Sequence, residues 1–136
     1  MIAVVATTAA AQDRSKWTNE MLEAKHNMIA EQVGLTPSQK ERFMPLYEAM
    51  EKEIYQTNRD ARALAGNVGK KANPTDAEYL QAAEAMSNAK VREGEIEKKY
   101  FEKFSAILSN RQLFLLKQTE ANFTREMLRG RKKSKN

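Results

Sequence analysis

The chain has 136 residues, enough for one domain with a modest core and too few for two well-buried ones. With only five glycines and three prolines, the composition favours helices. The absence of cysteine excludes disulfides, thiolate catalysis and cysteine-ligated metals. The net charge is +5, but six of the basic residues lie in 125–136, so the remaining body is neutral and lacks the basic face that binds nucleic acid.

Residues 1–12 form an apolar run that ends in small residues, with alanine at positions 9 and 11. The run is too short to span a bilayer and is typical of the back half of a signal peptide, which would be cleaved after Ala11. The basic residues that begin a signal peptide are missing, so Met1 need not be the natural start. We therefore expect an exported protein, with a disordered leader over residues 1–12 as the alternative.

The first helix is expected over residues 15–33, where apolar residues recur at helical spacing. Gly34 follows the last of them and predicts a left-handed C-cap. His26, the only histidine, lies on this helix. A single imidazole falls short of the three or four ligands that a transition metal needs, so we expect no metal site and no cofactor.

A strong helix-start signal follows in Leu35-Thr36-Pro37-Ser38-Gln39. The Thr36 hydroxyl can accept from the backbone N–H of Gln39, and the Gln39 side chain can accept from the N–H of Thr36, which is a capping box. The second helix is expected from Pro37 to about residue 65. Pro45 lies inside the apolar pattern and should bend this helix rather than end it.

Residues 66–74 contain two glycines and a proline without periodicity, which predicts the longest loop. Thr75 and Glu78 then form another capping box, and the third helix is expected to continue to Leu108. Its middle, residues 87–95, is mostly polar and should pack thinly.

Leu108-Ser109-Asn110-Arg111-Gln112 repeats the first box, with Ser109 as the cap and Gln112 three residues later. The fourth helix is expected to end at Gly130, which gives a helical domain over residues 13–130. Residues 131–136 are basic, hold no apolar side chain and should form a disordered tail. This tail would contact an anionic membrane surface weakly or act as a solubilising end.

The predicted fold is therefore all-α, a bent antiparallel helical hairpin of about four helices. Such a long, thin hairpin would expose much of its apolar stripe as a monomer. Pairing with a second copy would cover that stripe, so a homodimer is expected.

The two boxes, Leu35-Thr36-x-x-Gln39 and Leu108-Ser109-x-x-Gln112, in a small charged helical chain resemble the Spy/CpxP family of bacterial periplasmic proteins, which carry the LTxxQ motif. The second box departs from the motif, because Ser109 replaces threonine, but it keeps the capping chemistry. The resemblance covers residues 15–130 and implies a periplasmic, curved antiparallel homodimer.

The resemblance also implies a function: an ATP-independent chaperone-like protein that binds unfolded polypeptides under envelope stress. The alternative is a periplasmic regulatory subunit that restrains a membrane-bound signalling partner, either an anti-sigma or a two-component system. Some metal-sensing relatives bind metals through histidines and methionine of the first helix, but His26 stands alone here.

The carboxylates lie at salt-bridge spacing with Lys and Arg, and the chain has no Gly-rich phosphate loop or nucleophile elbow, so no enzyme is expected. Flexible methionines and tyrosines on the two long helices favour a surface that accepts many shapes. The candidate client contacts are Tyr47, Met50, Tyr79 and Met86. The competing interpretation places these four side chains in the core.

Overall fold

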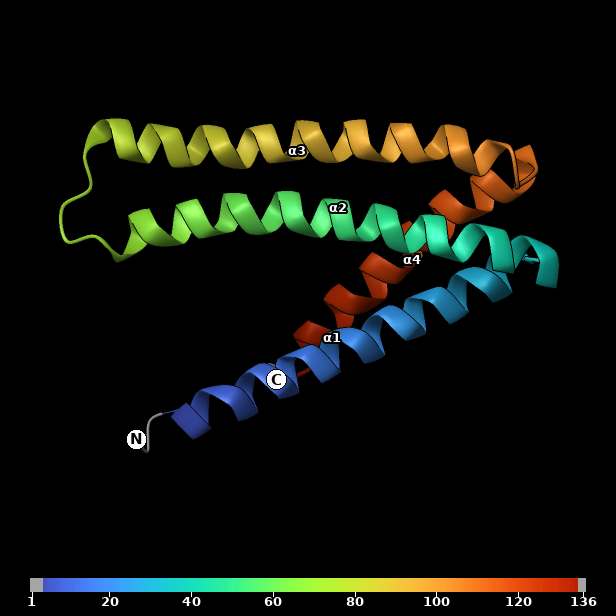
Figure 1. Cartoon of the computed structure of the whole chain (residues 1–136), viewed down its shortest axis with the longest axis horizontal. Coiled ribbons are helices and arrows are strands. Elements are labelled where there is room, and N and C mark those ends of the chain that lie inside the picture. The colour runs from blue at the N-terminus through green and yellow to red at the C-terminus, as the bar shows by residue number, and fades with distance from the viewer. Residues whose placement is uncertain (1–3, 135–136) are drawn as a thin grey trace. The chain divides into compact units, whose positions relative to one another are not determined.

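The computed structural model describes the backbone of residues 4–134 and the side chains of residues 18–130. Its four helices are α1 (Val4–Val33), α2 (Pro37–Lys70), α3 (Asp76–Ser105) and α4 (Asn110–Ser134) (Figure 1). Residues 4–134 contain no strand, which confirms the all-α prediction. The chain divides into a terminal unit, residues 1–40 and 109–136, and a central unit, residues 41–108.

The two outer helices are longer than predicted. α1 begins at Val4 instead of residue 15, because the Ala-rich segment 4–12 consists largely of residues that the helix tolerates well. α4 runs to Ser134, so the predicted end at Gly130 and the disordered tail are wrong for residues 131–134. A helical glycine costs only about 1 kcal/mol relative to alanine, too little to end a helix by itself.

The loop between α2 and α3 is shorter than predicted, because α2 continues to Lys70 and only residues 71–75 connect it to α3. Buried Val68 anchors the last turn of α2 between the two glycines that the sequence analysis assigned to the loop. The Thr75 box is formed as predicted: the Glu78 N–H donates to Thr75 Oγ1 at 3.1 Å and the Thr75 N–H to Glu78 Oε1 at 3.2 Å. α3 ends at Ser105, before the predicted Leu108.

Within the central unit, α2 and α3 pack side by side and antiparallel (Figure 1). Near the start of α2, the rings of Phe43 and Phe104 lie 4.8 Å apart, centroid to centroid. At its other end, Lys71 forms an ion pair with Glu78. Sequence numbers therefore rise along α2 as they fall along α3, and α2 continues through Pro45 without a break.

The terminal unit is built on the packing of α1 against α4. Its buried side chains include Ile29 and Val33 of α1 and Leu113 and Leu116 of α4. Between α1 and α2, Gly34 has a φ of 71°, and it is the only residue in 4–134 with a positive φ. A glycine adopts this conformation without strain, so the predicted C-cap is confirmed.

Candidate functional site

Both predicted boxes of the terminal unit are formed, with the same geometry. At the start of α2, the Gln39 N–H donates to Thr36 Oγ1 and the Thr36 N–H to Gln39 Oε1, each at 3.1 Å. At the start of α4, the Gln112 N–H donates to Ser109 Oγ at 3.1 Å and the Ser109 N–H to Gln112 Oε1 at 3.0 Å. Serine therefore replaces threonine without loss of the capping bonds.

The two boxes also bind each other, which the sequence analysis did not foresee. The side-chain amides of Gln39 and Gln112 lie face to face, and each Nε2 is 2.9 Å from the other residue's Oε1. Gln112 Nε2 lies 3.3 Å from the carbonyl oxygen of Gly34 as well. The contact joins residues 73 positions apart and fixes the corner between α1 and α2 to the start of α4. The only signal in the sequence was that both boxes use glutamine.

The leucines that precede the two caps differ in burial. Leu35 is half-buried in the terminal unit, whereas Leu108 is buried in the central unit. The boxes therefore act as helix caps and as a tie within the terminal unit. The hydrogen bonds of the two boxes are capping bonds and the amide pair, as expected for a structural role.

The four predicted client contacts fall into two classes. Tyr47 is 0 % exposed and Met50 is 3 % exposed, whereas Tyr79 is 55 % and Met86 is 50 % exposed. The prediction is wrong for Tyr47 and Met50, because they lie on the buried side of α2, where the Tyr47 ring is 6.0 Å from that of Phe104. Only Tyr79 and Met86 can meet a partner without unfolding of the central unit.

A larger exposed apolar surface lies on α3. Positions 80, 83, 87, 91, 94, 98 and 101 recur at intervals of three and four, and all seven are exposed. We call this surface the outer strip of α3; its large apolar members are Leu80, Val91 and Phe101. The strip lies away from the buried side of α3, which carries Ile96 and Phe104. Its spacing is visible in the sequence, but periodicity alone does not show which of two apolar faces of a helix is buried.

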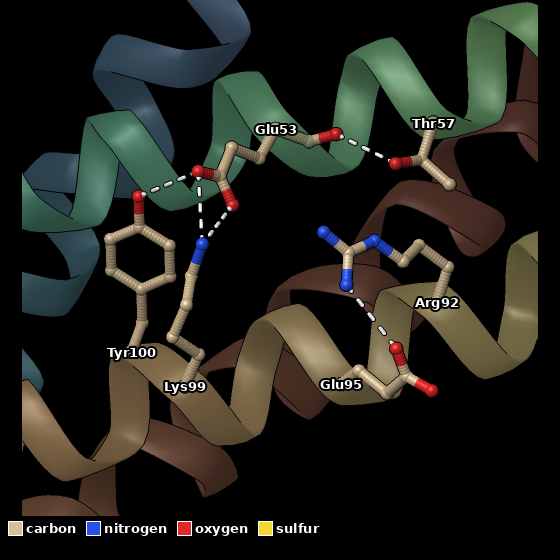
Figure 2. A network of polar contacts seen from close by, with 6 residues as sticks. All are labelled: Glu53, Thr57, Arg92, Glu95, Lys99 and Tyr100. Carbon is tan, nitrogen blue, oxygen red and sulfur yellow. Dashed lines mark hydrogen bonds and ion pairs between the residues drawn. The ribbon is translucent and has the colours of Figure 1, made fainter.

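An ion-pair network joins α2 to α3 in the middle of the central unit (Figure 2). Glu53 accepts from Lys99 Nζ at 2.8 and 3.1 Å and from the Tyr100 hydroxyl at 3.2 Å. The hydrogen bond from Lys99 is the main reason why the pKa of Glu53 is lowered. Burial, and then the charge of Glu53, raise the pKa of Tyr100. A lowered pKa favours the ionised form of Glu53 and a raised pKa favours the protonated form of Tyr100, and these are the forms that the hydrogen bond from Tyr100 to Glu53 requires.

Beside this network, a groove of about 400 Å³ lies between α2 and α3. Its lining combines three alanines and a leucine with polar and charged side chains: Thr57, Asp60, Ala61, Leu64, Ala85, Asn88, Ala89 and Arg92. Arg92 forms an ion pair with Glu95 at 3.2 Å, and its other terminal nitrogen points toward α2 (Figure 2). The groove is open and holds both charge signs, which suits weak contact with a side chain more than tight binding of a small molecule.

The described residues contain no group of three or more metal-ligand side chains that could hold an ion, and His26 is half-buried on α1. In the same part of the chain, no helix combines the length and the apolar character that crossing a membrane requires. Comparisons with protein-family models, with curated proteins and with solved structures find no match. The resemblance to the Spy/CpxP family therefore rests on the two boxes.

Proposed function

We propose that the chain is an exported, ATP-independent, chaperone-like protein of the Spy/CpxP type that binds unfolded polypeptides. The observation that carries this proposal is the outer strip of α3, where Leu80, Val91 and Phe101 are exposed among charged side chains. These three side chains share one side of α3 and are ten or eleven positions apart, with Ala83, Ser87, Gly94 and Lys98 between them. The strip therefore offers a row of separate apolar contacts along the helix, and we propose that clients bind along this row.

The chemistry of this surface suits unfolded clients. Tyr79 and Met86 flank the strip, and a methionine side chain adapts its shape to many partners. Lys90 and Lys98 on α3 alternate with acidic residues, so clients of either charge can be attracted over a distance of about 10 Å before apolar contact forms. Contacts of this kind form and break without nucleotide.

We also propose that the four helices belong to a curved antiparallel homodimer, as the resemblance implies. If the outer strip takes clients, then the dimer contact must lie elsewhere on the chain. The variant Leu80→Ser with Val91→Ser should therefore remain dimeric in sedimentation at micromolar concentration. A dimer that dissociates in this variant would assign the strip to the second copy.

The direct test measures aggregation of a denatured client with the full chain at an equimolar ratio and no nucleotide. We expect the wild-type protein to slow aggregation and the variant Leu80→Ser with Val91→Ser to lose most of that activity. Gln81→Ser is the matched control, because it places serine next to Leu80 at an exposed position outside the strip. No activity of the wild-type protein would favour a regulatory subunit that restrains a membrane-bound signalling partner.

A further inference from the structure

The exposed side of α4, in the terminal unit, forms another surface along a single helix. Positions 111, 114, 118, 121, 125 and 128 recur at intervals of three and four, so they share one side of the helix, and all six are exposed. We call this surface, together with neighbouring Arg129, the cationic face of α4. The opposite side of the helix carries buried Leu113, Leu116 and Thr119.

The charge of the cationic face has one sign. It carries Arg111, Arg125 and Arg129 and no acidic residue. The two acidic residues of α4, Glu120 and Glu126, lie off this face, and Glu120 is paired with Lys117 at 3.4 Å. Because α4 continues to Ser134, the basic sequence Arg131-Lys132-Lys133 extends the same helix. The backbone of residues 131–134 thus continues α4 rather than forming a separate tail.

Two large apolar side chains stand among these arginines. Phe114 is 65 % exposed and Leu128 is 57 % exposed. They are fourteen positions apart, which places them about 21 Å apart along the helix. Arginine stems can lie along apolar material while the guanidinium groups stay in a polar layer. A partner that presents a flat, negatively charged surface over an apolar layer would fit both the arginines and these two apolar side chains.

We propose that the cationic face of α4 binds the surface of a membrane that contains anionic lipids. An anionic bilayer would pair with the arginines and take Phe114 and Leu128 below the headgroups, as it does with other basic amphipathic helices. Nucleic acid would use only the charges. The proposal goes beyond client binding, since it concerns α4 and the terminal unit, whereas the outer strip belongs to the central unit.

The test measures co-sedimentation of the full chain with vesicles of equal parts phosphatidylcholine and phosphatidylglycerol, and with phosphatidylcholine vesicles alone. We expect binding to the anionic vesicles that weakens as salt is raised, and little binding to the neutral ones. Each basic residue at an anionic surface raises the partition coefficient about fivefold. Arg125→Gln with Arg129→Gln should therefore lower it about 25-fold.

The matched charge control is Lys52→Gln with Lys70→Gln, which removes two exposed positive charges of α2 in the central unit. This control should bind vesicles like the wild-type protein. Phe114→Ser with Leu128→Ser keeps every charge, yet it should lower the partition coefficient at least about tenfold, because it removes the apolar insertion. Circular dichroism would establish that each variant keeps its helices.

Three results would overturn the proposal. The first is that the wild-type protein does not bind anionic vesicles. The second is that the lysine control loses as much binding as Arg125→Gln with Arg129→Gln. The third is that Phe114→Ser with Leu128→Ser binds like the wild-type protein and duplex DNA competes fully with the vesicles. The last result would assign the face to a polyanion contacted through charge alone. Gln81→Ser and Leu80→Ser with Val91→Ser leave α4 unchanged. Both should therefore bind anionic vesicles like the wild-type protein, whether or not the chaperone proposal holds.

Discussion

Gln39 and Gln112 hold the starts of two helices together through a reciprocal pair of side-chain amides, with 2.9 Å between each Nε2 and the other Oε1. Each Oε1 also accepts the backbone N–H of its own cap residue, Thr36 or Ser109. Each glutamine therefore closes its own box and binds the other box at the same time.

This geometry predicts that the two glutamines are energetically coupled. Gln39→Ala and Gln112→Ala should each lower the free energy of unfolding by about 1 kcal/mol or more, since each removes a cap bond and the shared contact. The double variant should lose less than the sum by at least about 0.5 kcal/mol. Urea unfolding of the four proteins gives this coupling directly, with Gln81→Ala as an exposed control within about 0.5 kcal/mol of wild type. Strict additivity would show that the amide pair contributes nothing.

The burial of Tyr47 and the exposure of Tyr79 predict opposite consequences for the same substitution. Tyr47→Ser removes a ring that packs on Phe43 and Phe104, so it should cost about 3–5 kcal/mol of stability. Tyr79→Ser should change stability by less than about 0.5 kcal/mol, because the side chain is exposed. Thermal unfolding measures both. A tolerant Tyr47 site would mean that the aromatic cluster of the central unit is looser than its ring distances indicate.

The sequence was sufficient for local structure and insufficient for contacts between distant residues. The capping bonds of Thr36 and Ser109 were predictable, because donor and acceptor lie three positions apart. The amide pair of Gln39 and Gln112 was not, because it depends on how α1 and α4 pack. Tyr47 and Tyr79 both lie at apolar spacings, and only the packing of α2 on α3 shows that the first is buried and the second exposed.

Helix ends were misjudged for a related reason. A glycine in the sequence marks either a cap or a helix interior, and the backbone conformation decides between them. Gly34 adopts a positive φ and ends α1, whereas Gly66, Gly69 and Gly130 continue their helices. At Gly130 the residues that follow, Arg131 and two lysines, are good helix formers, whereas Gly66 is followed by Asn67 and Val68, where burial of Val68 rather than local propensity accompanies the helix.

The same contrast gives a prediction for alanine substitutions of glycine. Gly94 lies inside α3, and a Cβ there would meet no atom within 4 Å, so Gly94→Ala should raise stability by about 0.5–1 kcal/mol. At Gly34 there is also space for a Cβ, but its φ of 71° is strained for alanine, so Gly34→Ala should lower stability by about 1 kcal/mol. Urea unfolding of both variants checks the signs. A gain at Gly34 would indicate that the corner between α1 and α2 relaxes to another conformation.

The ion pair of Glu53 with Lys99 predicts a stability change in acid. The pKa of Glu53 is lowered from its ordinary value of 4.5, chiefly by the hydrogen bond from Lys99. The ionised Glu53 carboxylate therefore adds to the free energy of unfolding above pH 4.5, and this stabilisation is lost as the pH falls through the lower pKa of the folded state. Urea midpoints measured over this acid range should fall less steeply for Glu53→Gln than for wild type. The pKa of Glu78 is lowered too, chiefly by the hydrogen bond from Lys71, so the urea midpoint of Glu53→Gln should still fall to some extent in acid.

Tyr100 predicts a second loss of stability, at the alkaline end. Burial, and then the negative charge of Glu53, raise the pKa of the Tyr100 hydroxyl above its ordinary value of 10.0. Above pH 10 the unfolded chain ionises this phenol while the folded chain keeps it protonated, so stability falls as the pH rises toward the folded-state pKa. Tyr100→Phe has no phenol to ionise at this position. It should be less stable than wild type at neutral pH, because it lacks the hydrogen bond to Glu53, and the difference should shrink as the pH rises above 10. Urea midpoints of the two proteins measured up to strongly alkaline pH give this difference, and a gap that stays constant or widens would show that Tyr100 is not held protonated by the network.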